Sequence, residues 1–209
     1  MPKTAIVIGA SGLVGSSLVD QLATSQHIER VICLNRRPMP HKHTNVSHYE
    51  IYFEQLDTAV KYLQGDYLFS CLGTTKKAAG SVEAQRHVDF DHQYTIAKIA
   101  AKQGVEHYLL VSAIGANAAS NNAYLKMKGE LEQKILRLPF KRISIIRPSL
   151  LLGERQERRW GESAAAVVMP TLCKLPVPIL RKYQPVSAEH VASQLVEASR
   201  RLHHGVICG

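Results

Sequence analysis

A short apolar run that breaks into regularly spaced glycines constrains this chain more than any other stretch. Residues Ala5 to Ile8 are continuously apolar, as in a parallel-sheet strand that is covered on both faces. Glycines follow at positions 9, 12 and 15, and the sequence then resumes with a helical pattern. This spacing permits a sharp turn and a close approach of backbone to phosphate, and a helix N-terminus attracts an anion. The stretch predicts a strand, a phosphate-binding turn and a helix, with a dinucleotide as the ligand.

The glycine pattern is G-x-x-G-x-x-G rather than the more common G-x-G-x-x-G, and such a triplet is a weak signal when it stands alone. Its position after the first strand and before a helix favours cofactor binding, while a purely structural glycine-rich turn is the alternative. The cofactor contacts predicted in this turn are Gly9, Ser11, Gly12, Leu13, Val14 and Gly15.

A second apolar strand, Val31 to Leu34, is followed by Asn35, Arg36 and Arg37. Dinucleotide folds that prefer NAD usually place an acidic residue at the end of this strand, where it binds the ribose hydroxyls. Here the acid is missing, and two guanidinium groups suit a 2′-phosphate. These three residues therefore predict NADP(H) as the cofactor, and a solvated basic pair on the surface is the alternative.

Strand and helix patterns alternate as far as Pro148, which predicts an α/β fold with a doubly wound parallel sheet of the Rossmann type. Because ligands of such sheets lie at the carboxyl ends of the strands, the turn after the fourth strand should border the cofactor through Leu72, Gly73, Thr74 and Thr75. For Thr74 and Thr75, an ordinary strand exit without a ligand is the alternative. The further strands are predicted at Val46–Tyr52, Tyr67–Leu72, His107–Val111 and Arg142–Ile146, and the helices at Leu56–Leu63, Val82–Gln103 and Ala123–Leu136.

The remaining residues, 149–209, are too few for an independent domain, so we expect one domain over 1–209 with a small C-terminal helical cap. Residues 153–161 read as a polar loop, and 162–175 as an apolar helix that could line the substrate side. A second helix is predicted over Ala188–Leu202, followed by an edge strand at Val206–Cys208.

Ser112 ends the predicted fifth strand, and Tyr124 and Lys128 follow on the next helix. The latter two are four residues apart and share a helix face. A phenol that titrates near pH 10 in water becomes a better acid or base beside an ammonium, and Ser112 could hold the same substrate oxygen. These residues predict a catalytic Ser-Tyr-Lys site, although a snorkelling lysine beside a half-buried tyrosine is the structural alternative.

Other titratable residues give weaker signals. We expect His87, Asp89, Asp91 and His92 to be solvated or capping groups at the head of a helix. Three histidines between positions 41 and 48 lie in a polar loop at uneven spacing, and the four cysteines form no C-x-x-C pair. No metal site is predicted.

The formal net charge of +9 raises the question of nucleic-acid binding. The basic residues form separate short clusters without interleaved aromatic residues, so no nucleic-acid partner is predicted. No apolar run reaches the roughly 18 to 20 residues that a membrane span requires, and the N-terminus lacks an apolar signal core, so no membrane association is expected. These features lead us to expect a cytoplasmic protein with a small carbonyl or hydroxyl substrate, and they leave a protein partner or a homodimer open.

Taken together, these motifs resemble the short-chain dehydrogenase/reductase superfamily, in its atypical NADP-binding branch. The order of motifs is most similar to that of the Tat-interacting-protein-like oxidoreductases. The residues that carry this resemblance are G9-A-S-G-x-x-G15, Leu72-Gly73-Thr74-Thr75, Ser112, Tyr124-Leu125-x-x-Lys128-Gly129-Glu130, Arg147-Pro148-Ser149 and Gly153-Glu154-Arg155-Gln156-Glu157.

The resemblance implies a Rossmann fold, bound NADP(H) and a Ser112-Tyr124-Lys128 active site at which Tyr124 and Lys128 also contact the cofactor. It also implies a turn beside the nicotinamide, formed by Arg147, Pro148, Ser149 and Leu150. The function expected is transfer of hydride to or from a small carbonyl or hydroxyl compound. Because some relatives of this type have a regulatory role, an NADPH-binding sensor with little or no turnover is the alternative.

Overall fold

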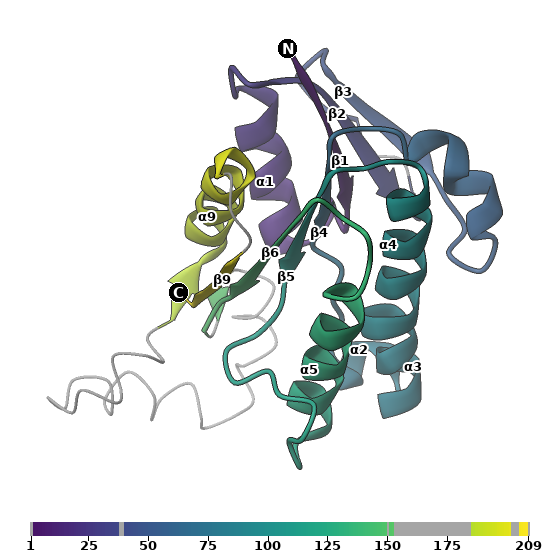
Figure 1. The fold of residues 1–209 in the computed structure, drawn as a ribbon, viewed down its shortest axis with the longest axis vertical. Helices are drawn as coiled ribbons and strands as arrows, with labels where there is room; N and C mark the ends of the chain where they lie inside the picture. Colours follow the sequence, from purple (N-terminus) through teal and green to yellow (C-terminus); the bar gives the residue numbers. More distant parts are fainter. Residues whose placement is uncertain (1, 38–39, 150, 153–184, 202–204, 209) are drawn as a thin grey trace, which may run out of the picture.

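The computed structural model describes residues 2–37, 40–149, 151–152, 185–201 and 205–208 (Figure 1). Seven parallel strands form the main sheet, in the order β3-β2-β1-β4-β5-β6-β9. This topology confirms the predicted Rossmann fold. The strands are β1 Lys3–Ile8, β2 Ile28–Asn35, β3 Val46–Glu50, β4 Tyr67–Ser70, β5 His107–Val111, β6 Arg142–Arg147 and β9 Gly205–Cys208.

The first strand occupies the centre of the sheet, between β2 and β4. Ile6 on β1 lies opposite Ile32 on one side and Leu68 on the other, and all three are buried. Burial on both faces explains why these strands read as continuous apolar runs. The strand order reverses between β1 and β4, and a reversal of this kind opens a ligand-binding crevice at the carboxyl ends of the strands.

Helices cover both faces of the sheet, as Figure 1 shows. On one face, α1 (Leu13–Ala23) packs beside α9 (Ala188–Arg200), and the core between these helices and the sheet includes Ala5 and Val7 of β1. The opposite face carries α4 (Gln93–Lys102) and α5 (Ala123–Ile135), with Ile6 and Ile8 of β1 in its core. The alternation of β1 side chains thus supplies two separate apolar layers.

The described C-terminal elements complete one helical layer and one edge of the sheet. Helix α9 lies against α1 over the sheet, and β9 extends the sheet by pairing with β6 in parallel. Near the same end, β7 (Leu151–Leu152) pairs with β8 (Val186–Ser187), a two-stranded element that sequence reasoning did not predict. The predicted loop at 153–161 and helix at 162–175 lie outside the described residues.

Several predicted elements differ in the structure. The segment Leu56–Tyr62 is a 3-10 helix (η1), β3 stops at Glu50 rather than Tyr52, and β4 stops at Ser70 rather than Leu72. The long helix predicted over residues 82–103 contains a π-helical turn, and polar side chains along it bind the neighbouring loop. Its parts are α3 Val82–Arg86, the π-turn η2 His87–His92 and α4, and the short α2 Lys76–Ala79 precedes them.

Candidate active site

The turn between β1 and α1 packs directly on the exit of β4. Gly9 has a φ of +79°, a conformation that residues with a Cβ atom rarely adopt. A Cβ atom at Gly9 would also lie 2.6 Å from the backbone of Cys71 and Leu72. The amide of Cys71 donates a hydrogen bond to the carbonyl oxygen of Ile8, at 3.0 Å. The first glycine is therefore required both by its conformation and by the closeness of β4.

The other two glycines shape the start of α1. A Cβ atom at Gly15 would overlap the carbonyl oxygen of Gly9, so the helix can approach the turn this closely only through a glycine. Gly12 is the N-cap residue of α1 and offers no side-chain cap, and the first turn of the helix contains no acidic residue. An uncapped helix N-terminus behind a close-packed glycine turn fits the pyrophosphate of a dinucleotide.

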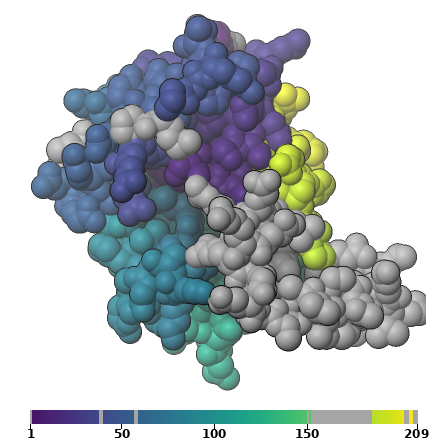
Figure 2. Space-filling model, turned by 180° about the vertical axis from the view of Figure 1, so that it is seen from behind, coloured from purple at the N-terminus to yellow at the C-terminus, as the bar shows by residue number. Residues whose placement is uncertain are grey.

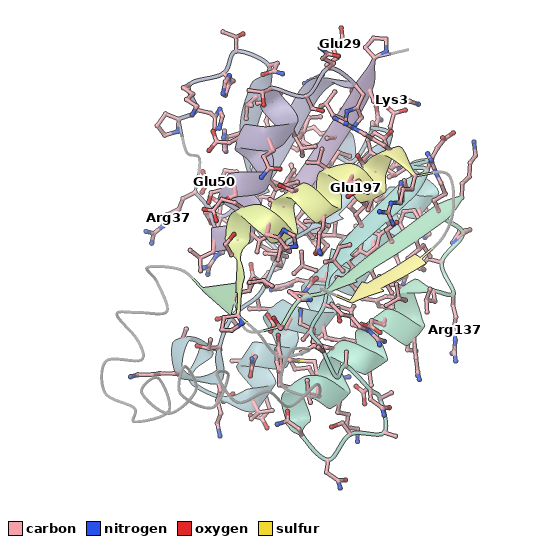
Figure 3. The ribbon with its side chains drawn as sticks, turned by 90° about the vertical axis from the view of Figure 1, so that its left-hand side faces the viewer. Lys3, Glu29, Arg37, Glu50, Arg137 and Glu197 are labelled. Atoms are coloured by element: carbon pink, nitrogen blue, oxygen red, sulfur yellow. The ribbon has the colours of Figure 1, made fainter. Side chains whose placement is uncertain are left out.

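The residues after β2 lie at the same end of the sheet. Both Arg36 and Arg37 are exposed, and Figure 3 shows Arg37 projecting away from the body of the domain. Asn35 is buried instead, with its side-chain nitrogen 3.0 Å from Nδ1 of His48. In the space-filling view, the segments around residues 35–60 and 75–90 adjoin on one face (Figure 2). The two exposed guanidinium groups are therefore accessible to a ligand at the end of β2.

The loop after β4 is held by side chains from α3, η2 and α4. Thr74 donates its backbone N–H to Oδ1 of Asp89 at 2.7 Å, and its carbonyl oxygen accepts from Gln85 at 3.1 Å. Gln93 donates to the carbonyl oxygen of Leu72 at 3.2 Å, and Thr75 caps α2. These hydrogen bonds therefore hold the backbone of the loop that is predicted to border the cofactor.

Ser112 follows β5 at the carboxyl end of the sheet. Its backbone N–H donates to the carbonyl oxygen of Ile146 at 2.8 Å, and two residues later Ile114 donates to the carbonyl oxygen of Pro148 at 2.9 Å. These bonds join the exits of β5 and β6. The Ser112 hydroxyl is buried and has no hydrogen-bond partner among the described residues, so it could donate to a substrate oxygen.

The start of α5 is fixed to the loop that carries Ser112. Asn122 caps the helix by accepting hydrogen bonds from the N–H groups of Tyr124 and Leu125. A Cβ atom at Gly129 would overlap the backbone of Asn117 and Ala118, so this glycine permits the close approach of helix and loop. The sequence between Ser112 and Lys128 therefore folds back on itself as one packed unit.

The predicted catalytic pair occupies two different environments on α5. Tyr124 is 37% exposed, whereas Lys128 is only 3% exposed. The ammonium of Lys128 is 3.4 Å from the carbonyl oxygen of Val111. Burial raises the pKa of the nearby Cys71 thiol to about 12, and the charge of Lys128 opposes that rise. The structure thus places Lys128 inward, beside the residue that precedes Ser112, and leaves the first turn of α5 accessible.

Arg147 has a structural partner on α5. Its guanidinium binds the carboxylate of Glu132 through two contacts, of which the Nε–Oε1 distance is 3.0 Å. This side chain therefore connects the end of β6 to the helix that carries Lys128. Pro148 and Ser149 are buried beside it, and Leu150 lies outside the described residues.

The expectation that Asp89 and His92 are solvated is wrong, because both are buried in η2. Gln85, Asp89 and Gln93 recur every four residues on the helix face that turns toward the sheet, and all three are buried. That polar stripe ahead of the apolar Ile96 and Ala97 was a usable signal in the sequence. His87 and Asp91, by contrast, are exposed.

A cluster of polar side chains forms away from the histidine loop considered in the sequence. Glu54, His87 and His92 bring one polar atom each within 4.8 Å of one another. Two of the three side chains are exposed, and such groupings are common on surfaces that bind no metal, so we assign no metal to them.

The glycine turn before the uncapped start of α1, on a parallel sheet of this order, defines a dinucleotide-binding protein of the Rossmann type. Residues 9–160 match the model of the NAD(P)H-binding family. The chain belongs to this family.

Two relatives illustrate the match. The chain is 37% identical to Protein HTATIP2 from Rattus norvegicus over 164 residues, covering 77% of this chain and 67% of that protein. It is also 37% identical to Protein FMP52, mitochondrial, from Candida glabrata over 163 residues, covering 76% and 68% of the two chains. These matches confirm the resemblance inferred from the motifs.

Solved structures confirm the fold. The structure of MoeE5 in complex with UDP-glucuronic acid and NAD is similar at a TM-score of 0.72 and 16% identity, covering 99% of this chain and 76% of that chain. Among the described residues, none of the helices has the length and apolar character needed to cross a bilayer.

The expectation of a cytoplasmic protein is contradicted by the relatives, several of which are described as mitochondrial. That expectation depended on the lack of an apolar signal core. Such a core distinguishes secreted chains and carries no information about import into mitochondria.

Proposed function

We propose that this protein is an NADP(H)-dependent oxidoreductase that transfers hydride to or from a small carbonyl or hydroxyl compound. The observation that carries the proposal is the burial of Ser112 and Lys128 at the edge of the sheet that also bears the glycine turn. Buried polar side chains beside a cofactor-binding turn are typical of an active site. The relatives described as mitochondrial lead us to propose a mitochondrial location.

The cofactor would lie across the carboxyl ends of β1, β2 and β4. Gly12 and the first turn of α1 would hold the pyrophosphate, and the fixed loop at Leu72–Thr75 would border the nucleotide. Arg36 and Arg37 are exposed at the end of β2, and no described residue forms an ion pair with either side chain. Their availability supports NADP(H) over NAD(H), because guanidinium groups bind phosphate strongly.

When bound, the nicotinamide ring supplies or accepts the hydride. Tyr124 would donate its phenolic proton to the substrate oxygen during reduction and take it back during oxidation. Lys128, four residues further along the same helix, would be the electrostatic partner of Tyr124, and the unpartnered Ser112 hydroxyl would donate a hydrogen bond to the same substrate oxygen. The 37% exposure of Tyr124 is compatible with contact to a substrate that arrives from solvent.

A titration followed by a turnover assay tests the proposal. Purified protein is titrated with NADPH and with NADH, and the NADPH complex is then mixed with a panel of aldehydes, ketones and quinones while absorbance at the nicotinamide band is recorded. We expect tighter binding of NADPH and oxidation by at least one carbonyl compound. Tight binding without turnover across the panel would favour the NADPH-sensing alternative, and lack of binding would exclude both.

A further inference from the structure

We propose that Asp89 is the buried counter-ion of Lys128, and that it positions this lysine beside the loop that borders the cofactor. The support for this pairing is the burial of both charged groups where η2 packs against α5, at the carboxyl ends of β4 and β5. Its role in the reaction rests on the proposed function above. Asp89 would be a positioning residue that acts through Lys128, without contact to the substrate.

Asp89 has one satisfied oxygen and one unsatisfied oxygen. The side chain is completely buried, and its Oδ1 accepts the hydrogen bond of 2.7 Å from the backbone of Thr74. The other oxygen, Oδ2, is also buried and has no hydrogen-bond partner among the described residues. Leaving a buried carboxylate oxygen unpaired is costly, so a nearby positive charge is the expected compensation.

The ammonium of Lys128 also has too few hydrogen-bond partners among the described residues. Its ammonium can donate three hydrogen bonds, and the one described contact is the 3.4 Å approach to the carbonyl oxygen of Val111. This distance is long for a hydrogen bond, and the side chain is 3% exposed. A buried ammonium with one weak neutral acceptor requires an opposite charge close by.

The ammonium of Lys128 lies more than 4.0 Å from the carboxylate oxygens of Asp89, so its influence on this group is through charge and not through a hydrogen bond. Burial raises the pKa of Asp89, and the largest opposing influence is the positive charge of Lys128. The hydrogen bond from the backbone of Thr74 lowers the pKa of Asp89 further. Lys128 lies beside Val111 at the exit of β5, and Asp89 binds Thr74 in the loop after β4. These two strands are neighbours, and η2 packs against α5.

The π-helical turn explains how a carboxylate reaches this place. Asp89 sits inside η2, and residues on both sides of it, Gln85 and Gln93, bind the backbone of the loop after β4. The wider turn keeps all three side chains on the inner face, and π-turns of this kind recur at functional sites. Asp89 therefore connects two parts of the site, the backbone of Thr74 through one oxygen and Lys128 through its charge.

A double-mutant cycle on thermal unfolding tests the pairing without any substrate. Asp89→Asn keeps an oxygen for Thr74 but removes the charge, and Lys128→Met removes the ammonium but keeps an apolar chain of similar length. Each single variant leaves a buried charge uncompensated, so we expect each Tm to fall by about 10 °C. The double variant contains neither charge, and its Tm should fall by much less than the sum of the single shifts.

Asp91→Asn is the matched control, because Asp91 lies on the same turn but is exposed. Its Tm should stay within about 2 °C of the wild type, and its combination with Lys128→Met should be additive. Additive shifts for Asp89→Asn and Lys128→Met would overturn the pairing. If the two single variants do not fold, the yield of soluble protein replaces Tm as the measurement. A double variant that is soluble supports the pairing. Insolubility of both single variants and of the double variant would overturn it.

The positioning role has a separate readout. With 9,10-phenanthrenequinone as the probe oxidant, we expect Asp89→Asn to bind NADPH within about threefold of the wild type and to lose at least tenfold in kcat, with an altered pH profile of kcat. An unchanged kcat and pH profile would overturn the positioning role while the proposed function stands. A wild type that neither binds NADPH nor oxidises it would refute the proposed function, and the unfolding cycle would still decide whether the two charges are paired.

Discussion

The ammonium of Lys128 approaches the carbonyl oxygen of Val111 at 3.4 Å, which connects helix α5 to the end of strand β5. Val111 immediately precedes Ser112, so this contact brings two of the three predicted catalytic residues to the same edge of the sheet. Because parallel strands present their carboxyl ends together, that edge also carries the glycine turn after β1. The arrangement suits chemistry on a substrate oxygen beside a bound dinucleotide.

Cofactor choice should depend on the two arginines after β2. Replacing Arg36 and Arg37 with glutamine should weaken NADPH binding by roughly 1.5 to 3 kcal/mol for each charge-assisted hydrogen bond that the substitution removes, and should leave NADH binding nearly unchanged. Fluorescence titration with both nucleotides measures the difference. Arg30→Gln, an exposed arginine on the same strand, is the control. Equal weakening of both nucleotides would show that these guanidinium groups do not meet the 2′-phosphate.

Gly15, in the first turn of α1, packs too closely against the preceding turn to tolerate a side chain. A Cβ atom at Gly15 would overlap the carbonyl oxygen of Gly9, so Gly15→Ala must move the helix away from the turn. Overpacking of this kind costs about 1 to 3 kcal/mol and should also abolish NADPH binding by displacing the N-terminus of α1. Gly205→Ala is the control, because nothing lies within 4 Å of a Cβ atom there. A Gly15→Ala variant with normal Tm and affinity would contradict the packing.

The ion pair between Arg147 and Glu132 should matter more for folding than an exposed pair. The Glu132 side chain is 5% exposed, so Arg147→Met would leave a carboxylate buried without its partner. We expect a loss of about 3 to 5 kcal/mol in the free energy of unfolding, measured with urea. Arg201→Met breaks an exposed pair with Glu197 and should cost about 0 to 1 kcal/mol. Similar losses for both variants would contradict this account.

Acid should destabilise the protein through its partly buried histidines. Burial lowers the pKa of His27, His48 and His92 below the ordinary value of 6.5. The unfolded chain therefore binds more protons than the folded one as the pH falls below about 6.5, so stability present at pH 7.5 is lost toward pH 5.5. Thermal unfolding at these two pH values measures the loss, and His48→Gln should reduce it. A Tm that is constant or higher at pH 5.5 would contradict this prediction.

The strands were predictable from the sequence because burial on both faces leaves a continuous apolar run. The limits of β5 were predicted correctly, and β1, β2 and β6 were found at their predicted places with small extensions. Amphipathic periodicity also located α9, but it reveals only that one face is apolar. The surface that this face covers, beside α1, is set by contacts distant in sequence, and periodicity carries no information about them.

The site was predictable to a similar extent. Glycine spacing identified the turn, and the structure explains Gly9 and Gly15 through close backbone approaches. The burial of Asp89 was missed because a charged residue near a helix start is usually solvated, and only the tertiary fold shows that the backbone of Thr74 donates a hydrogen bond to it. The π-turn at His87–His92 was missed as well, because the sequence pattern of this stretch is that of one continuous helix.

The most direct test of the central claim is the rate of NADPH oxidation by the Tyr124→Phe variant, measured with a carbonyl compound that the wild type reduces. The variant keeps the ring and loses only the proton that Tyr124 would donate. We predict an NADPH affinity within about threefold of the wild type and a kcat reduced by roughly 10² to 10⁴, the usual contribution of a general acid. Full turnover by Tyr124→Phe would contradict the claim that this phenol acts on the substrate oxygen.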